Sequence, residues 1–414
     1  MKNEIFFING SGYSPKNVLI IAELGTGHAG DKAKAGELID AAAEAGADCI
    51  KFQMVYAMEI LHPNTGDVSL PGGKVNLFER FRALEQPPSF FAEMKEKAEK
   101  RGLIFLCTPF GLRSARELRE LGPSCIKIAS PELNYTALLK EIATYSLPVL
   151  LSTGVSRLGD IEEALEILSS QSPVPSGPST FAANRGIAGP TPCRICPNNA
   201  LTGSGAITWR PHSPVCLLHC VTSYPAPEKD YNLRVLGNLA SIFGLPVGLS
   251  DHSLDPCLVP ALGTAMGAAV IEKHFCLSQT DSGLDDPIAL TPASFALMVR
   301  TVRQAEKAGP EETLEALRRE HGVETVESVL GDGVKRLAPS EKENYERTNR
   351  SVHALVDIAA GEIIEKEMIA SFRTEKNLMP GLPPSWEGRI TGLRAKTFIP
   401  AGEGINFEDI VGTL

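Results

Sequence analysis

The sequence contains no apolar run that approaches the roughly 20 residues needed to cross a lipid bilayer. Its opening stretch, MKNEIFFING, includes an acidic residue and lacks the apolar core of a secretory signal. The 9 cysteines are scattered and odd in number, which does not indicate a disulfide framework. We therefore expect a cytoplasmic protein with reduced thiols and no membrane partner.

An excess of basic residues is also missing, because the formal net charge is -10. This charge argues against a general nucleic-acid-binding protein, although a basic pocket for a small anion can exist on an acidic surface. The composition, 43% hydrophobic and 22% charged, is that of an ordinary globular protein, and 414 residues are enough for two or more domains.

Short apolar runs alternate with amphipathic, charged segments, a pattern typical of a parallel α/β sheet. KAGELIDAAAEAGA (34–47), SFFAEMKEKAEKRG (89–102) and GDIEEALEILSS (159–170) are predicted helices. Eight strands predict a TIM barrel. A doubly wound open sheet is the alternative, but the sequence has no glycine-rich dinucleotide loop to support it. The predicted strands are Val18–Glu23, Cys49–Gln53, Ile104–Cys107, Cys125–Ala129, Val149–Ser152, Val215–His219, Val247–Leu249 and Val270–Lys273.

The alternation predicts a barrel domain over residues 1–307. One segment interrupts it, and a second segment follows it. Residues 171–214 are rich in Pro, Gly, Ser and Thr and predict a long surface loop. Within it, Cys193-x-x-Cys196 is either half of a zinc site, completed by His212 or Cys216, or a pair of ordinary loop thiols. Residues 308–349 are charged and helical, and we expect them to form a linker.

The sequence pattern changes after residue 349. ALVDIAAGEIIEKEMI (354–369) and AKTFIPAGEGINFEDI (395–410) match at 8 of 16 positions, including an Ala-Gly-Glu turn. This duplication of a short strand–turn–helix unit predicts a second, separate domain over 350–414.

Polar residues close every predicted strand, where the active site of a TIM barrel lies. Lys51 and Gln53 are two residues apart and so share one face of their strand, as do Lys127 and Ala129. A lysine between apolar residues needs a partner for its charge. One explanation is a Lys–Glu pair that fills the barrel interior. The other is a cradle for a phosphate or carboxylate, in which hydroxyls add directional donors, namely Thr108, Ser130, Ser152 and Ser250.

Two histidines follow successive strands, His252 in LPVGLSDHS and His274 in AAVIEKHF. A single histidine at a strand end is most often a hydrogen-bonded core or rim residue. Two of them beside an anion cradle suit a divalent metal, with Glu23 or Asp285 as a carboxylate ligand of an open site. The residues thus predict a metal-assisted enzyme for a small phosphorylated or carboxylated substrate and a carbonyl partner.

Eight motifs, in order, resemble the sialic acid (N-acetylneuraminate) synthase family, and residues 350–414 resemble its antifreeze-like (SAF) domain. The motifs are IIAELGTGHAGD, IKFQ, CTPF, IKIASPE, LSTG, LLHCVTSYPAP, GLSDHS and EKHF.

The resemblance implies a TIM barrel with a SAF domain, in a swapped homodimer whose small domains cap the partner's barrel. It also implies a transferase that condenses phosphoenolpyruvate with an N-acetylated aldose, commonly N-acetylmannosamine. The products would be a nonulosonic (sialic) acid and phosphate.

The same resemblance assigns roles to individual residues. His252 and His274 would bind Mn²⁺, with Mg²⁺ or Co²⁺ as alternatives. Glu132, and second Glu23, would handle protons, while Lys51 and Lys127 neutralise the departing phosphate. Phosphoenolpyruvate would be held by Lys51, Thr108, Lys127, Ser130, Ser152 and Ser250. The sugar and the water would be surrounded by Glu23, Gln53, Glu132, Thr222, Tyr224 and Asp285.

Departures from the family pattern cluster on the sugar side. Met379 stands where the family has an arginine that enters the sugar site, and Arg373 is a possible substitute. The other departures are Gly27, Ala29, Pro131 and Thr222. The acceptor could therefore be a legionaminate- or pseudaminate-type precursor. The further alternatives are a metal-dependent aldolase or isomerase, a related sugar-phosphate synthase without the SAF tail, and a non-catalytic carbohydrate-binding relative.

Overall fold

The computed structural model describes residues 5–70, 73–170, 200–201, 207–208, 215–281, 283–375 and 377–411. Most of the predicted surface loop lies outside these residues, including Cys193, Cys196 and His212, so the zinc hypothesis stays a prediction. Its one candidate inside them, Cys216, is fully buried in a strand. Of the loop, only the short pair β10 (Ala200–Leu201) and β11 (Ile207–Thr208) is described.

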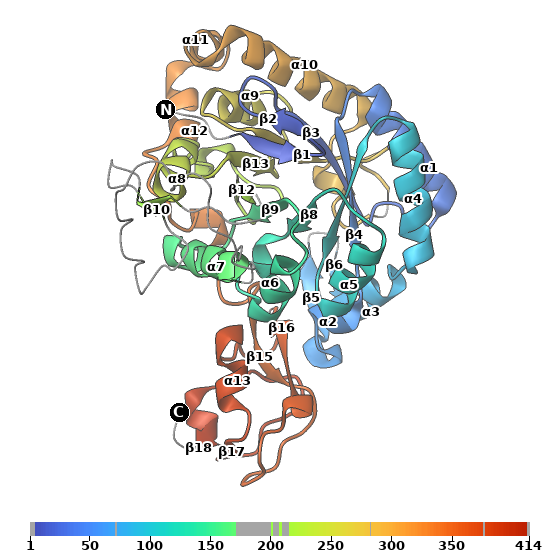
Figure 1. The fold of residues 1–414 in the computed structure, drawn as a ribbon, viewed down its shortest axis with the longest axis vertical. Helices are drawn as coiled ribbons and strands as arrows, with labels where there is room; N and C mark the ends of the chain where they lie inside the picture. The colour runs from blue at the N-terminus through green and yellow to red at the C-terminus, as the bar shows by residue number, and fades with distance from the viewer. Residues whose placement is uncertain are drawn as a thin grey trace, which may run out of the picture.

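The main domain is an eight-stranded parallel barrel, as predicted (Figure 1). Its strands follow the order β7-β4-β3-β14-β13-β12-β9-β8, and β7 contacts β8 to close the barrel. All eight strands coincide with the predicted apolar runs. They are β3 (Leu19–Gly25), β4 (Cys49–Met54), β7 (Ile104–Pro109), β8 (Ile126–Ile128), β9 (Val149–Ser152), β12 (Val215–Cys220), β13 (Val247–Asp251) and β14 (Val270–His274).

Helices cover the outside of the barrel (Figure 1). Their apolar faces and the outward strand residues form one large core. The predicted helices 34–47, 89–102 and 159–170 are found as α1, α4 and α7. The helices are α1 (Lys32–Glu44), α2 (Ala57–Ile60), α3 (Leu77–Ala83), α4 (Pro88–Lys100), α5 (Leu112–Glu120), α6 (Thr136–Ala143), α7 (Leu158–Ser170), α8 (Val235–Phe243), α9 (Leu258–Ala265) and α10 (Pro292–Ala308).

The inside of the barrel changes from apolar to polar along the strands. Because alternate residues face the same way, Ile21 near the start of β3 shares its face with Glu23 near the end. The same step leads from Cys49 to Lys51 in β4. The apolar end is closed by the hairpin of β1 (Phe6–Ile8) and β2 (Ser11–Tyr13), which packs on the interior residues. The polar groups therefore gather at the carboxyl ends of the strands.

The segment predicted as a linker is largely packed on the barrel. Its helices are α11 (Pro310–His321) and α12 (Val323–Leu330), and both add side chains, such as Leu317 and Val329, to the main core. Residues 308–349 are thus not a free linker, because helices with charged outer faces also carry apolar inner faces. Past α12, Lys335 donates to the carbonyl of Thr153 (2.7 Å) and so anchors the chain to the loop after β9.

The small domain has its own apolar core and lies at one end of the molecule (Figure 1). Each predicted repeat contains a turn whose glycine has a positive φ, +83° at Gly361 and +95° at Gly402, a conformation that favours glycine. A 3₁₀ turn, at Lys366–Met368 and Phe407–Asp409, takes the place of the predicted helix. The other elements are β15 (Arg350–Ala354), β16 (Ile369–Arg373), α13 (Glu387–Ile390), β17 (Arg394–Ala395) and β18 (Ile410–Val411).

The small domain contacts the barrel of its own chain. Asn377 donates to the carbonyls of Thr65 (2.6 Å) and Asp67 (2.7 Å), near the hairpin of β5 (Asp67–Leu70) and β6 (Gly73–Asn76). In the swapped homodimer that the family resemblance implies, such contacts would form between two chains. The dimer stays a prediction.

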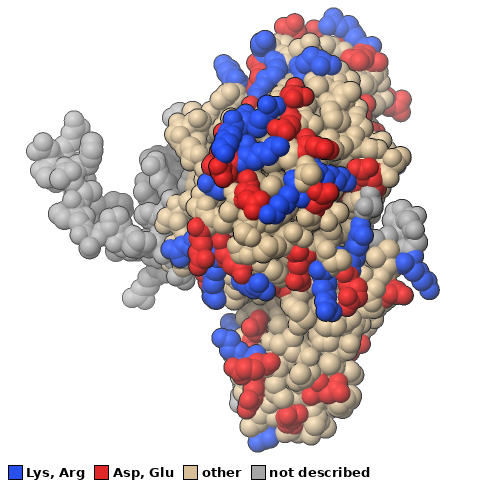
Figure 2. All heavy atoms as spheres, turned by 90° about the vertical axis from the view of Figure 1, so that its right-hand side faces the viewer, with Lys and Arg blue, Asp and Glu red and all other residues tan. Residues whose placement is uncertain are grey.

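On the face shown in Figure 2, acidic and basic side chains are interspersed. Among the described helices, none combines the length and apolar character that a membrane crossing requires.

Candidate active site

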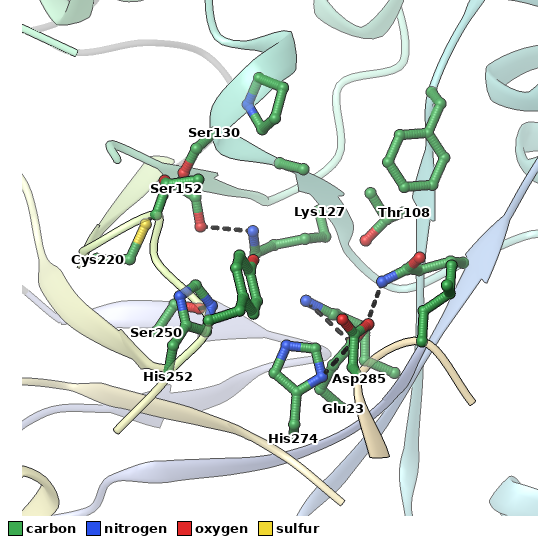
Figure 3. A pocket seen from close by; sticks show the side chains of 18 of the residues that line it. Glu23, Thr108, Lys127, Ser130, Ser152, Cys220, Ser250, His252, His274 and Asp285 are labelled. Carbon is green, nitrogen blue, oxygen red and sulfur yellow. Dashed lines mark hydrogen bonds and ion pairs between the residues drawn. The ribbon is translucent and has the colours of Figure 1, made fainter. Parts of the chain in front are cut away.

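A cavity of about 220 Å³ lies at the carboxyl ends of the barrel strands. It is lined by fourteen of the fifteen residues that the sequence predicts, and Glu132 is the exception. Figure 3 shows side chains that line this cavity, with Glu23, Lys127 and His274 among those labelled. The fourteen are Glu23, Lys51, Gln53, Thr108, Lys127, Ser130, Ser152, Thr222, Tyr224, Ser250, His252, His274, Asp285 and Arg373.

Two buried lysines and two buried glutamates form the charged floor of the cavity. Lys51 Nζ lies 3.0 Å from Glu23 Oε2 and 2.8 Å from Glu272 Oε2. Lys127 Nζ lies 3.9 Å from Glu272 Oε1. The Lys–Glu pairing considered from the sequence is therefore present, and it lines the cavity instead of filling it.

The pKa values follow from this arrangement. Burial lowers the pKa of Lys51 to about 8, although Glu272 beside it opposes the shift. Burial alone would raise the pKa of Glu272, but Lys127 and Lys51 together bring it down to about 2. Glu272 is thus ionised at neutral pH and fixes the lysines in place.

Hydroxyl groups surround the lysines. Lys127 Nζ donates to Ser152 Oγ (2.6 Å), and Ser250 Oγ donates to Glu272 Oε1 (2.8 Å). The backbone N–H of Gly154 donates to Ser130 Oγ (3.0 Å). The hydroxyls of Thr108 and Thr222 are buried without a hydrogen-bond partner in the described parts of the chain. Free hydroxyls beside lysines suit an anion with several oxygens.

The two predicted metal ligands lie together. The ring centroids of His252 and His274 are 5.5 Å apart, and Tyr224 stacks on His252 at 4.3 Å. His252 Nδ1 lies 2.8 Å from the carbonyl of Val221, which can only accept, so Nδ1 carries the hydrogen and Nε2 keeps its lone pair. Burial lowers the pKa of His252 to about 4 and that of His274 to about 3. Both rings are therefore neutral, as metal ligands must be.

The donor set fits a divalent metal in part. Within the described ranges, no three His, Cys, Asp or Glu side chains come together as a metal-binding group. Asp285 Oδ2 lies 3.8 Å from His274 Nδ1 and is the carboxylate nearest to completing an open site. Two neutral imidazoles and one carboxylate suit Mn²⁺ or a similar ion with exchangeable positions.

Part of the cavity lining is apolar. Ile60 and Phe110 belong to one hydrophobic cluster, against which Phe81 packs, and all three line the cavity. The Arg373 guanidinium lies 5.3 Å from the centre of the Phe110 ring. Met379 is 62% exposed and does not line the cavity, whereas Arg373 does. The replacement of the family arginine by Arg373 stays a prediction.

Glu132 does not occupy the position that the sequence predicts. Its side chain is fully buried beside the cavity, and its Oε1 accepts hydrogen bonds from Arg350 and Arg373. Oε1 is thus committed to the two arginines, and Oε2 is buried without a hydrogen-bond partner among the described residues. The proton-transfer role stays a prediction.

Two charged residues were missed from the sequence. Glu272 lies two positions before His274 in β14, so strand alternation places both on one face and would have identified it. Arg350 opens β15 in the small domain, and no local pattern links it to Glu132. Cys220 also lines the cavity, with Sγ 3.0 Å from Ser130 Oγ.

Comparisons with known proteins agree with this geometry. The model of the NeuB family matches residues 38–313, and that of the SAF domain matches residues 349–411. N,N'-diacetyllegionaminic acid synthase of Campylobacter jejuni is 32% identical over 86% of this chain and 91% of that protein.

Two solved structures are similar over most of the chain. The spore coat polysaccharide biosynthesis protein SpsE of Bacillus subtilis has a TM-score of 0.73 and 30% identity, covering 99% of this chain and 100% of that chain. The N-acetylneuraminic acid (sialic acid) synthetase of Leptospira borgpetersenii, solved with citrate, has a TM-score of 0.59 and 28% identity, covering 83% and 96%. The barrel, its polar cavity and the small domain thus place the chain in the NeuB family, with a C-terminal SAF domain.

Proposed function

We propose that this protein is a nonulosonic acid synthase that condenses phosphoenolpyruvate with an N-acetylated aldose and releases phosphate. The observation that carries the proposal is the cradle of Lys51, Lys127 and hydroxyls at the carboxyl ends of the strands. Relatives named as legionaminic, pseudaminic and N-acetylneuraminate-9-phosphate synthases support the reaction class.

The proposed reaction forms one carbon–carbon bond and breaks the bond between carbon 2 and the phosphate oxygen. Carbon 3 of phosphoenolpyruvate forms a bond to the aldehyde carbon of the sugar, and the aldehyde oxygen takes up a proton. Water adds at carbon 2 and gives up a proton, and the resulting tetrahedral centre expels phosphate to leave a 2-keto acid. Lys51 and Lys127 would bind the phosphate and carboxylate oxygens and neutralise charge on the leaving group.

Glu23 is the proposed residue for proton transfer. It lines the cavity, its Oε1 accepts from Gln53 Nε2 (2.8 Å), and its Oε2 pairs with Lys51. His252 and His274, with Asp285, would hold the divalent ion, Mn²⁺ in the first place and Mg²⁺ or Co²⁺ as alternatives. When bound, such an ion supplies Lewis-acid polarisation of the aldehyde oxygen.

The apolar residues of the cavity favour an acceptor sugar that carries apolar groups. Ile60, Phe81 and Phe110 offer an apolar surface for methyl or acyl groups in the same cavity as the buried lysines. This favours an N-acetylated aldose such as N-acetylmannosamine. A second candidate, a diacetylated legionaminate-type precursor, is favoured by the same apolar surface and by the 32% identical synthase.

The test is phosphate release from phosphoenolpyruvate with Mn²⁺ and a panel of N-acetylated aldoses, with the product mass measured. Release with one sugar, lost on chelation and restored by Mn²⁺, is expected. Lys127→Met should abolish release, whereas Lys32→Met, which changes an exposed lysine, should not. An aldolase or isomerase would release no phosphate, and a binding protein would retain the metal and sugar without turnover.

A further inference from the structure

The two arginines beside Glu132 face each other across a hairpin of the small domain. Arg350 in β15 is the register partner of Arg373 in β16. Like charges directly opposite one another on antiparallel strands destabilise the pair. Here the barrel supplies the compensating charge, since Glu132 ends the 3₁₀ turn Ser130–Glu132 that follows β8.

Four N–H groups converge on one carboxylate oxygen. Glu132 Oε1 accepts from Arg350 Nε (3.2 Å) and Nη2 (2.9 Å), and from Arg373 Nε (3.0 Å) and Nη2 (2.8 Å). Charge-assisted bonds of this kind are stronger than neutral ones, and the planar guanidinium fixes their direction. Glu132 thus binds both guanidinium groups through one oxygen.

The two arginines differ in how many of their N–H donors remain free for a ligand. Arg350 is fully buried, and its other N–H groups donate to the carbonyls of Glu59, Ile60, Phe110 and Ser371. Arg373 lines the cavity, its side chain is 12% exposed, and its Nη1 makes no hydrogen bond with the described residues. Arg373 therefore keeps donors for a ligand, whereas those of Arg350 are used within the fold.

We infer that Glu132 is a positioning residue that holds the Arg373 guanidinium at the cavity and takes no part in proton transfer. It acts on the substrate only through Arg373, which it orients against Phe110 on the acceptor side. The identity of the ligand as the sugar acceptor rests on the proposed function; the positioning itself does not.

The kinetic test is a double-mutant cycle with the full chain. We expect Glu132→Ala and Arg373→Ala each to lower kcat/KM for the sugar by roughly 10- to 100-fold, as for a lost charged hydrogen bond, mostly through KM. KM for phosphoenolpyruvate should change little. The double variant should be no worse than Arg373→Ala alone, because Glu132 has nothing left to orient.

The conservative variants separate positioning from chemistry. Glu132→Gln keeps an acceptor oxygen for the arginines and should restore most of the activity lost in Glu132→Ala, with an unchanged pH–rate profile. A proton-transfer residue would instead lose about 10²- to 10⁴-fold in kcat as Gln. That loss, or an additive cycle, would overturn the inference.

A spectroscopic measurement makes the inference independent of activity. In the wild type, the Nε–H of Arg373, assigned by its loss in Arg373→Lys, should be protected from exchange because it is bonded to Glu132. Glu132→Ala should remove this protection. Equal exchange in both proteins would refute the positioning even if no sugar is turned over, whereas absent turnover with protected Nε–H would refute only the proposed function.

Discussion

Replacing Lys273 by methionine should destabilise the protein by about 3–5 kcal/mol, the cost of leaving a buried charge without its partner. Lys273 and Asp251 are both fully buried, and Nζ lies 2.6 Å from Asp251 Oδ2. Nζ also donates to the carbonyl (2.5 Å) and the hydroxyl (3.2 Å) of Ser253. The methionine fills a similar volume, so the loss reports on charge and hydrogen bonding.

The magnitude follows from the geometry. Unit charges 2.6 Å apart attract by about 6 kcal/mol at an effective dielectric constant of about 20. The variant no longer pays the desolvation cost of a buried ammonium group, and this gain offsets part of the lost attraction. The Asp251 carboxylate is left without its charged partner at the end of β13, directly before His252.

The assay is urea unfolding followed by circular dichroism, with the free energy of unfolding extrapolated to water. Lys32→Met is the matched control, because Lys32 pairs with Glu93 on the surface and should contribute at most about 1 kcal/mol. The double variant Lys273→Met with Asp251→Asn should recover part of the loss, since no buried charge is left. A loss below 1 kcal/mol for Lys273→Met alone would refute the reasoning.

Three further outcomes are expected. Gly154→Ala should raise KM for phosphoenolpyruvate, because an added Cβ would lie 2.2 Å from Thr222 Oγ1; an unchanged KM would exclude this loop from the cradle. His252→Ala and His274→Ala should abolish turnover and weaken metal retention, measured by elemental analysis after gel filtration; full turnover in both would remove the metal assignment. Burial lowers the pKa of His353 to about 4, so the unfolded state binds the proton first as the pH falls. The contribution of His353 to stability is therefore fully present above pH 6.5 and is lost by about 1.4 kcal/mol per pH unit below it, towards pH 4. Urea unfolding between pH 4 and 7 should show a slope that is smaller in His353→Gln, and an equal slope would contradict the assignment.

The alternation of residues along strands explains why so much of the site could be predicted. Lys51 and Gln53 share a face in any strand, and the carboxyl ends of barrel strands converge at one mouth. The eight strand ends therefore predict twelve of the fourteen lining residues, whereas Asp285 and Arg373 come from other segments. Glu272 follows the same rule, because it lies two residues before His274 in β14 and shares its face.

Other features depend on contacts between segments far apart in the chain. Glu132 is 218 residues from Arg350, and nothing near either residue indicates that they meet. The charged helices α11 and α12 were predicted to be a linker for a similar reason. Their outer faces dominate the composition, while the burial of Leu317 and Val329 is decided by the barrel surface that they cover.

The sequence by itself determined the eight strands, the two-domain organisation and the polar character of the strand ends, because these follow from local periodicity and strand geometry. Only the tertiary structure decided how the charges pair. Lys51 lies between two glutamates, and Glu132 is held by two arginines of the small domain. The physical reason is that a buried charge needs a partner in space, and that partner can come from anywhere in the chain.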